Sequence, residues 1–338
     1  MIAVLGASGA VGSRVLAALR SRGFETRAGS RTSGVDLRDE RSLAGFVDGA
    51  RLVVNCAGPS HDTAERVMAV ALRAGADHVD AGGDRTRSPS SRPRDVPGRT
   101  AVFSAGASPG LSGLLPRSLA PGFTEVATLV SYSGVLDRFT PAGAEDFLSG
   151  TTEAGAAWRD GERVSRAVSR VSGLTLPRLP RSVIALPFLD EENVSVALDL
   201  SLVDGTWFTF VEDGHLLGAI ERVPGLPASA AVRSLCDAAA LDMAGRDTHA
   251  TLLVQLTGTM DGVEAIRTAI ARAGSAAEMT AAVTVAAALA VLAGRCPEGV
   301  HQAAQVLDPA ELSELDGVDI VIEDRPIEEL ALVEEGTL

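Results

Sequence analysis

A short apolar strand, a glycine-rich turn and an amphipathic helix follow one another at the start of the chain. No other stretch of the sequence restricts the possible folds as strongly. The turn "GASGAVG" holds Gly6, Gly9 and Gly12 and lies between "IAVL" and "SRVLAALRSRG". A glycine inside a helix or strand costs roughly 0.5–1 kcal/mol relative to alanine, so clustered glycines need a geometric reason. Either another group approaches the backbone closely at this turn, or the turn is simply tight.

The position of this turn, directly after a strand and before a helix, is that of the dinucleotide-binding fingerprint. In such a turn the first glycine permits the bend, the second lets backbone amides reach a pyrophosphate, and the third lets helix and strand pack closely. The helix N-terminus adds unpaired N–H groups and a partial positive charge. The spacing is Gly-x-x-Gly-x-x-Gly rather than Gly-x-Gly-x-x-Gly, and a turn that binds no ligand is the alternative. We expect the cofactor to contact Gly6, Ser8, Gly9, Ala10, Val11 and Gly12.

The end of the second predicted strand bears on which dinucleotide binds. NAD-specific domains usually carry an acidic residue there, which binds the ribose 2′-hydroxyl. This strand ends in "RAGSR", with Ser30 and Arg31 and no carboxylate. A hydroxyl and a guanidinium suit a 2′-phosphate, which favours NADP (NADPH) over NAD; an exposed loop arginine is the alternative. At the next predicted strand end, Asp36 and Leu37 are expected to flank the adenine.

Strands and helices alternate up to about residue 122, which predicts an α/β fold with a parallel sheet and helices on both faces. Beyond that point the pattern changes to longer, partly alternating strands, one of which covers residues 193–211 with a hairpin turn at Asp204–Gly205. This change predicts a second, α+β domain. The apolar run at residues 280–294 predicts a buried helix.

Composition and charge argue against several partners and locations. The formal net charge is −14 and no basic run offsets it, so a nucleic acid or an anionic membrane would be repelled on average. Three widely separated cysteines argue against a disulfide framework and a zinc site, and for a reducing compartment. The longest apolar run is shorter than the ~20 residues that span a bilayer, and we find no signal peptide. We expect a cytoplasmic protein that binds a small-molecule substrate and no metal.

Lysine is missing from the sequence, because all 30 residues counted as Lys or Arg are arginine. A Schiff-base lysine is therefore excluded. The tyrosine–lysine pair of short-chain dehydrogenases is excluded as well, since the one tyrosine, Tyr132, is followed four residues later by Leu136.

Two long segments resemble a known family. They are "LVVNCAGPSHDTAERVMAVALRAGADHVDAGGD" (52–84) and "AVFSAGASPGLSGLLPRSLA" (101–120), supported by "AWRDGERV" and "PEGVHQAAQVLDPAELSEL". Together they are similar to the saccharopine dehydrogenase-like family, which includes saccharopine reductase and carboxynorspermidine dehydrogenase. The resemblance covers residues 1–120 well and the rest loosely.

The resemblance implies a Rossmann domain (1–122), an inserted α+β substrate and dimerisation domain (123–277), and a C-terminal segment (278–338) that returns to the first domain. Such enzymes reduce or form a C=N bond between an amine or amino acid and a carbonyl with a nicotinamide cofactor, often as homodimers. By position, the resemblance places a loop of Cys56, Ala57, Gly58 and Pro59 near the nicotinamide and its ribose. It also places the loop with Gly106, Pro109 and Gly110 beside the active site, and we expect Ser108 and Pro109 of this loop to contact the cofactor.

Two features depart from the family pattern, and both concern the substrate side. The family often has aspartate where this chain has Ser108, and a proline-rich loop at 85–98 replaces a helix. The identity of the substrate should therefore not be inherited from the family.

Three residues are candidates for the proton chemistry, each with a plainer alternative. Tyr132 lies near the start of the second domain and otherwise packs at a strand end. His61 follows the "NCAGP" loop, titrates near neutral pH, and otherwise caps a helix. Asp80 ends a strand at the carboxyl edge of the sheet, where ligands bind, and otherwise stabilises a turn. Cys56 is better explained as a small buried residue than as a nucleophile, and Arg138, Arg159 and Arg222 are candidates for binding a substrate carboxylate.

The sequence thus predicts an NADP-dependent oxidoreductase that reduces an imine or carbonyl of a small amino-acid-like substrate. A non-catalytic NADP-binding sensor and a C=C reductase on the same scaffold are the alternatives.

Overall fold

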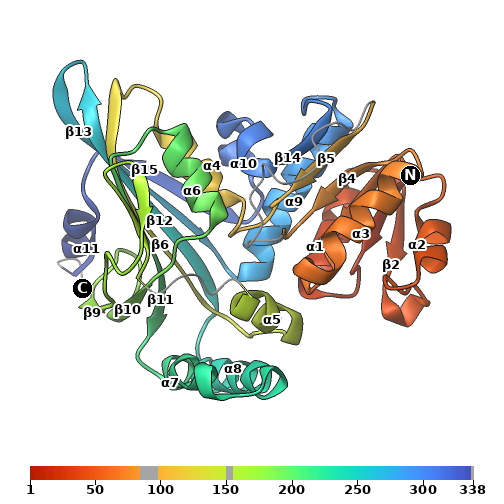
Figure 1. The fold of residues 1–338 in the computed structure, drawn as a ribbon, viewed down its shortest axis with the longest axis horizontal. Helices are drawn as coiled ribbons and strands as arrows, with labels where there is room; N and C mark the ends of the chain where they lie inside the picture. The colour runs from red at the N-terminus through yellow and green to blue at the C-terminus, as the bar shows by residue number, and fades with distance from the viewer. Residues whose placement is uncertain (84–97, 150–154, 336–338) are drawn as a thin grey trace. The chain divides into compact units, whose positions relative to one another are not determined.

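The computed structural model describes residues 1–83, 98–149 and 155–335, which form two compact units (Figure 1). Unit 1 consists of Met1–Leu114 and Ala276–Val318, and unit 2 of Leu115–Ser275 and Asp319–Leu338. Each unit therefore draws on two separate stretches of the chain. The predicted loop at 85–98 lies, except for Gly98, outside the described residues.

Unit 1 is built on a six-stranded parallel sheet with the order β14-β5-β4-β3-β1-β2. Four of its strands, β1, β3, β4 and β5, are almost wholly buried, as expected for a parallel sheet with helices on both faces. The strands are β1 (Ile2–Leu5), β2 (Thr26–Gly29), β3 (Leu52–Asn55), β4 (Asp77–Asp80), β5 (Thr100–Phe103) and β14 (Gly299–Gln302).

The helices of unit 1 form two pairs. Helix α1 packs with α9, and α2 packs with α3. Since the connections after β1 and β3 run in opposite directions, right-handed crossovers place the two pairs on opposite faces of the sheet. The helices are α1 (Ala10–Ser21), α2 (Glu40–Val47), α3 (Ser60–Arg73), α9 (Ala276–Leu292) and α10 (Ala303–Val306), with 3₁₀ turns η1 (Arg31–Ser33) and η4 (Pro309–Glu314). The α/β architecture expected from the sequence is confirmed, and the buried helix predicted at 280–294 is α9.

Strand β1 is the point at which the order of the sheet reverses. Its neighbours are β2 on one side and β3 on the other, and the helices after β1 and β3 lead away in opposite directions. The carboxyl ends of β1 and β3 therefore border the crevice in which open α/β sheets bind ligands.

Asp36 and Leu37 lie in the loop before α2, not at the end of a strand. The Oδ1 atom of Asp36 accepts a hydrogen bond from Arg38 N at 2.9 Å, and Asp36 N donates one to Ser42 Oγ at 3.0 Å. These local turns replace strand pairing, because β2 already forms the edge of the sheet. The expected strand end is therefore wrong, whereas the adenine contact stays a prediction.

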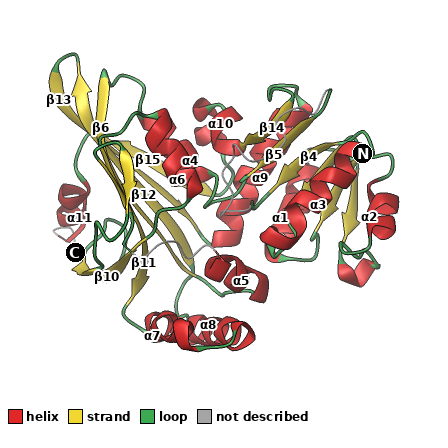
Figure 2. Ribbon diagram, in the orientation of Figure 1, coloured by secondary structure: helices red, strands yellow, loops and turns green. Residues whose placement is uncertain are grey.

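Unit 2 contains a nine-stranded sheet, mostly antiparallel, with the path β15-β13-β12-β6-β11-β10-β9, with β7 beside β11 and β8 beside β7 (Figure 2). Strand β11 runs parallel to β6. The strands are β6 (Glu125–Leu136), β7 (Ala157–Arg159), β8 (Glu162–Val164), β9 (Val171–Leu174), β10 (Val183–Pro187), β11 (Asp204–Glu212), β12 (His249–Met260), β13 (Val263–Ala273) and β15 (Val318–Glu323).

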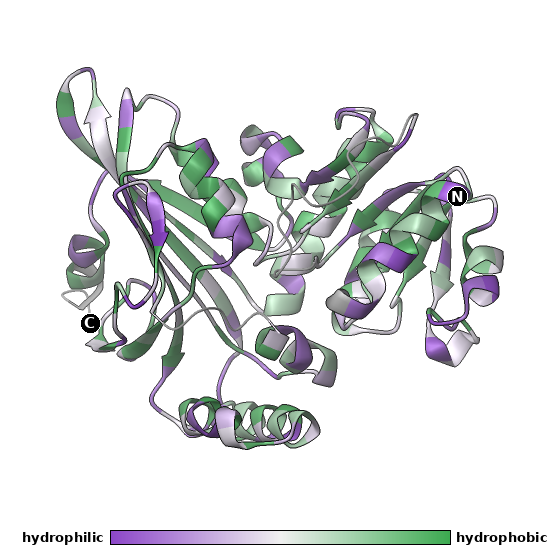
Figure 3. Cartoon of the chain, in the orientation of Figure 1, coloured by the Kyte–Doolittle hydropathy of each residue, from purple (hydrophilic) through white to green (hydrophobic). Residues whose placement is uncertain are grey.

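Two apolar clusters hold the helices of unit 2 to its sheet. Helices α5, α7 and α8 pack together with Val211 of β11, and both α7 and α8 carry apolar and polar residues in turn along their length (Figure 3). Helix α11 inserts Ile327 and Leu330 into a second cluster with Phe210, Leu253 and other strand residues. The helices are α4 (Leu111–Leu119), which begins in unit 1, α5 (Pro141–Ser149), α6 (Glu191–Asp199), α7 (His215–Arg222), α8 (Ala228–Asp242) and α11 (Ile327–Glu335), with the 3₁₀ turn η3 (Val223–Gly225).

The expected strand at 193–211 is in part a helix. Asp190 caps α6 by accepting a hydrogen bond from Asn193 N at 2.9 Å, and Glu191 and Glu192 occupy the first turn, where acidic side chains stabilise a helix. Only Asp204–Glu212 is a strand. Asp204 and Gly205 begin that strand, so the predicted hairpin turn is wrong, because the element directly before them is helix α6.

The C-terminal segment also differs from expectation. The sequence assigned all of 278–338 to the first domain, but residues 319–338 belong to unit 2. The reason is that β15 joins the sheet beside β13 and α11 buries Ile327 and Leu330 against that sheet.

Candidate functional site

Packing explains two of the three glycines in the turn after β1. Gly6 has a φ of 69°, and a Cβ atom on it would lie 2.6 Å from Cys56 O. A Cβ atom on Gly12 would lie 2.2 Å from Gly6 O. Both distances are shorter than any side chain tolerates, so the turn, the helix and the loop after β3 fit together only with glycine at these positions.

Packing does not explain Gly9. It is exposed and is the N-cap of α1, with an ordinary φ of −78° and no side-chain cap on the helix. Outside its chain neighbours and its own helix, the described residues bring a single atom within 4 Å of a Cβ on Gly9, namely Gly6 O at 3.1 Å. No side chain caps α1, and Ser8, Gly9 and Ala10 are exposed, so an anion can approach the N-terminus of this helix.

Ser30 and Arg31 follow the carboxyl end of β2. Ser30 forms a capping box with Ser33, in which each side chain binds the backbone N–H of the other residue, and its hydroxyl lies 2.8 Å from Thr32 Oγ1. Arg31 is exposed, and its guanidinium has no ion pair or hydrogen bond with any residue in the described part of the chain. The turn after β2 therefore carries a guanidinium that has no partner among the described residues. It follows the strand that pairs with β1, which leads into the glycine turn.

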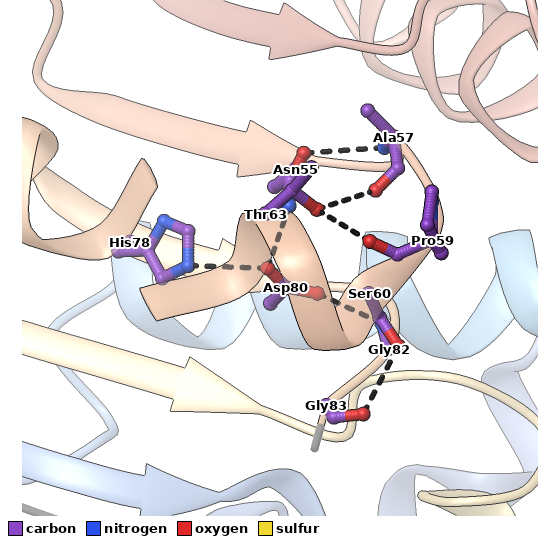
Figure 4. A network of polar contacts seen from close by, with 9 residues as sticks. All are labelled: Asn55, Ala57, Pro59, Ser60, Thr63, His78, Asp80, Gly82 and Gly83. Carbon is purple, nitrogen blue, oxygen red and sulfur yellow. Dashed lines mark hydrogen bonds and ion pairs between the residues drawn. The ribbon is translucent and has the colours of Figure 1, made fainter. Parts of the chain in front are cut away.

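The loop after β3 is tied down by hydrogen bonds (Figure 4). Ala57 N donates to Asn55 Oδ1 at 3.1 Å, and Thr63 Oγ1 of α3 donates to the carbonyl oxygens of Ala57 and Pro59, each at 3.1 Å. Ser60 Oγ donates to Gly83 O at 3.0 Å. The loop of Cys56, Ala57, Gly58 and Pro59 is therefore held in one shape at the carboxyl edge of the sheet.

Cys56 is not an activated thiol. Burial of the thiol and, secondly, the carboxyl group of Asp80 raise the pKa of Cys56 far above its ordinary value. A neutral thiol is a poor nucleophile, which agrees with Cys56 as a packing residue.

Asp80 lies at the end of β4 and is 1% exposed. Its Oδ2 atom accepts a hydrogen bond from Asn55 Nδ2 at 2.7 Å, and its Oδ1 atom accepts one from Gly82 N at 3.0 Å. His78 Nε2 lies 3.5 Å from Oδ2. Both carboxylate oxygens are thus engaged with protein groups, which favours the structural role over a direct substrate contact.

The loop after β5 closes back on itself. Leu111 N donates to Gly106 O at 2.9 Å and Gly106 N to Pro109 O at 3.2 Å, and Gly110 has a φ of 130°. Thr284 of α9 donates to Ala105 O at 2.7 Å. The loop with Ser108 and Pro109 therefore lies at the same edge of the sheet as the other predicted contact residues of unit 1.

The remaining catalytic candidates lie apart in the chain. His61 is in the first turn of α3 at the carboxyl edge of the unit 1 sheet, and its side chain lies outside the described residues. Tyr132 is on β6 of unit 2, where its ring stacks on Phe208 with centroids 5.3 Å apart and packs against the cluster that includes α11. Burial, followed by the charge of Glu328, raises the pKa of Tyr132. This placement favours the packing alternative for Tyr132.

The three arginine candidates of unit 2 differ in their hydrogen bonds and in their exposure. Arg159 donates to the carbonyl oxygens of Trp158 and Gly205 and to Thr206 Oγ1, so its guanidinium serves the strand junction. Arg138 and Arg222 are exposed.

One polar residue at the site was missed from the sequence. Asn55 is completely buried at the end of β3 and connects Asp80 to the backbone of Ala57. The available signal was a carboxamide that ends an otherwise apolar strand directly before a loop.

The described residues show neither a metal site nor a membrane-spanning helix. They contain no group of three or more His, Cys, Asp or Glu side chains that could hold a metal ion. Within the same ranges, no helix is both long and apolar enough to cross a bilayer.

The sequence matches no known family description and no curated protein. Among solved structures, C. glutamicum DAP dehydrogenase in complex with DAP is similar, with a TM-score of 0.50 and 16% sequence identity over 98% of each chain. An engineered D-amino acid dehydrogenase also has a TM-score of 0.50 and 16% identity, over 93% of this chain and 98% of that one. The fold is that of the Rossmann-type dehydrogenases, with a second sheet domain. Membership of the saccharopine dehydrogenase-like family stays a prediction.

Proposed function

We propose that this protein is an NADP-dependent oxidoreductase. The observation that carries the proposal is the open N-terminus of α1 at the point where the sheet order reverses. Gly9 leaves the N-terminus of α1 without a side-chain cap, Gly6 lets the turn lie against the loop after β3, and Gly12 lets α1 lie against the turn. A dinucleotide pyrophosphate is the anion that such a turn binds.

The proposed preference for NADP rests on Arg31. The site after β2 offers a guanidinium without a partner among the described residues and, at Ser30 and Arg31, no carboxylate to bind a ribose 2′-hydroxyl. A charge-assisted contact to a 2′-phosphate contributes roughly 1.5–3 kcal/mol, and solvent exposure reduces it toward the lower value.

We further propose that the reaction reduces the C=N or C=O bond of a small amino-acid-like substrate. The resemblance of residues 52–84 and 101–120 to the saccharopine dehydrogenase-like family supports this, and both similar folds named above are dehydrogenases. When bound, the nicotinamide supplies the hydride. The chain would bind and orient the cofactor. The N-terminus of α1 would hold the phosphates, and the loop 56–59 would form one wall of the site.

We propose His61 as the group that moves the proton. It stands in the first turn of α3, directly after the loop expected beside the nicotinamide, and histidine titrates in the physiological range. Asp80 is engaged on both oxygens and the Cys56 thiol is held neutral, so neither suits this task. His61→Ala should lower kcat about 100-fold, a typical general acid–base contribution, while NADPH binding persists.

A non-catalytic NADP-binding protein is the second candidate. One observation favours it: Asp80, which is hydrogen-bonded on both oxygens, and Cys56, whose thiol is held neutral, are two acidic groups beside the loop 56–59 that do not suit proton transfer. The two candidates predict the same cofactor binding and differ in turnover.

Paired titrations test the proposal. We expect NADPH to bind more tightly than NADH, and a screen of amine–carbonyl pairs to reveal NADPH oxidation by the wild type. Gly9→Val is the matched control, which should stay folded and bind neither cofactor. Cofactor binding without turnover on any pair would favour the sensor, and equal affinity of wild type and Gly9→Val would contradict a dinucleotide site at this turn. We expect a homodimer, which the molar mass in solution would test.

A further inference from the structure

Asn55 and Asp80 form a buried polar pair at the ends of neighbouring strands. They are 0% and 1% exposed and lie directly opposite each other in the parallel register of β3 and β4. Burying two such groups is costly unless their hydrogen bonds are made, and here they are made. The Asn55 amide donates to Asp80 at 2.7 Å, Gly82 N donates to the other carboxylate oxygen at 3.0 Å, and Ala57 N donates to Asn55 Oδ1 at 3.1 Å (Figure 4).

The chemistry of the partners fixes which way the Asn55 amide points. An ionised carboxylate only accepts hydrogen bonds, and a backbone N–H only donates. Asn55 must therefore turn its NH₂ group to Asp80 and its oxygen to Ala57 N. An amide at position 80 would lack this selectivity, because it would present a second NH₂ group either to Asn55 or to Gly82 N.

The pair reaches the glycine turn through the backbone of Cys56 and Ala57. A Cβ atom on Gly6 would lie 2.6 Å from Cys56 O and 2.7 Å from Ala57 N, so these two stretches of backbone are in direct contact. Ala57 N is the same group that Asn55 Oδ1 holds. A shift of the Asn55 amide would thus move the loop 56–59 and the first glycine of the turn together.

We infer that Asn55 and Asp80 are positioning residues for the cofactor site. Asp80 orients the Asn55 amide, and Asn55 sets the loop 56–59 against the glycine turn, so that the pyrophosphate end and the nicotinamide end of the site keep a fixed spacing. The inference rests on the proposed NADP site. Under this inference the carboxylate of Asp80 does not contact the substrate. Its role is to accept two hydrogen bonds, one from Asn55 and one from Gly82 N.

An exchange of the two side chains tests this directly. In Asn55→Asp alone, two carboxylates face each other and repel. In Asp80→Asn alone, two NH₂ groups compete, so one bond is lost. The double variant Asn55→Asp/Asp80→Asn restores each bond: the new carboxylate accepts from Ala57 N and from the new amide, whose oxygen accepts from Gly82 N. The charge moves from β4 to β3, and only the contact to His78, already 3.5 Å long, is weakened.

Three quantities are measured for wild type, both single variants and the exchange: the melting temperature, the Kd for NADPH, and kcat on the substrate found in the screen. We expect each single variant to raise the Kd about tenfold or more, the loss of one hydrogen bond to a charged group, and to lower the melting temperature. The exchange should bring both quantities back to within about threefold and a few degrees of the wild type. Asn193→Asp, another buried asparagine (4% exposed) but in unit 2, is the control and should leave the Kd unchanged.

The outcomes separate the inference from the proposed function. If the exchange restores melting temperature and Kd but leaves kcat about 100-fold low, the carboxylate of Asp80 acts on the substrate and the positioning role is refuted. If the exchange restores the melting temperature but not the Kd, the pair does not set the cofactor site, which also overturns the inference. If the wild type itself binds no NADPH, the proposed function fails and the inference fails with it. This outcome is measured without any variant, so it is distinct from the two above.

Discussion

Gly9→Ala and Gly12→Ala make the same chemical change three residues apart, and we expect opposite results from them. A Cβ atom on Gly12 would lie 2.2 Å from Gly6 O and 2.7 Å from Gly6 C, both backbone atoms of a tight turn. Ordinary contact begins near 3.4 Å, so the turn would have to move by about 1 Å. A Cβ atom on Gly9 lies 3.1 Å from Gly6 O, which a shift of a few tenths of an ångström relieves.

These distances set the expected magnitudes. Overpacking of a rigid site costs about 1–3 kcal/mol, so Gly12→Ala should lower the melting temperature by roughly 2–12 °C at about 2–4 °C per kcal/mol. Gly9→Ala exchanges a good N-cap residue for a poor one, which costs up to about 1 kcal/mol. Its Cβ, however, would stand at the N-terminus of α1, where the proposed pyrophosphate approaches the first-turn N–H groups. Losing one charge-assisted hydrogen bond to the pyrophosphate there, about 1.5–3 kcal/mol, weakens NADPH binding about 10- to 100-fold.

Thermal unfolding and fluorescence titration with NADPH measure both effects in the same samples. Gly45→Ala is the control, because Gly45 lies inside α2 and a Cβ on it would meet open space, and alanine there should stabilise by roughly 0.5–1 kcal/mol. Full NADPH affinity in Gly9→Ala would refute a phosphate site at this turn. A Gly12→Ala variant as stable as the control would refute the packing explanation of the turn.

Three further changes test other parts of the molecule. Arg31→Ala should weaken NADPH binding about tenfold and leave NADH binding unchanged in paired titrations; equal losses would mean that Arg31 supports the loop and does not grip a phosphate. Burial and, secondly, the charge of Arg272 lower the pKa of His249, which is 7% exposed, below 6.5. The unfolded protein therefore binds more protons at this residue than the folded one, and stability falls as the pH drops from about 6.5 toward the folded-state pKa. His249→Gln should make the melting temperature depend less on pH across that interval. An unchanged pH dependence would mean that another group causes it. Leu330→Ala in α11, 7% exposed, should cost about 2–5 kcal/mol in chemical unfolding, and a loss below 0.5 kcal/mol would show that α11 does not belong to the core of unit 2.

The parts of the fold that local sequence determines were predictable. The strand, turn and helix at residues 2–21 follow from apolar periodicity and from glycines whose spacing matches a known turn. The long helix α9 follows from an apolar run that is too short for a membrane and too regular for a loop. Both depend on neighbours within a few residues, which a sequence displays directly.

The parts that depend on distant pairing were not predictable. Asn55 matters because β3 and β4 bring it opposite Asp80, and the register of two strands 22 residues apart, from Asn55 to Asp77, is not visible in either strand. Residues 319–338 belong to unit 2 because β15 pairs with β13, and nothing local indicates the partner. Helix α6 could have been found, since Asp190 followed by Glu191 and Glu192 is a helix start, but the alternation of valine with polar residues favoured a strand.

The division of each unit into two stretches of chain has a consequence for biosynthesis. A ribosome that has translated the first 275 residues has completed neither unit, because unit 1 still lacks α9 and β14, and unit 2 still lacks β15 and α11. Domains usually fold as they emerge, starting from the N-terminus, yet here both interiors stay open until late in translation. Apolar strands such as β1 and β3 are therefore exposed to other nascent chains for most of synthesis, and we expect slow translation or chaperone binding, more than the stability of the finished protein, to set its yield in a cell.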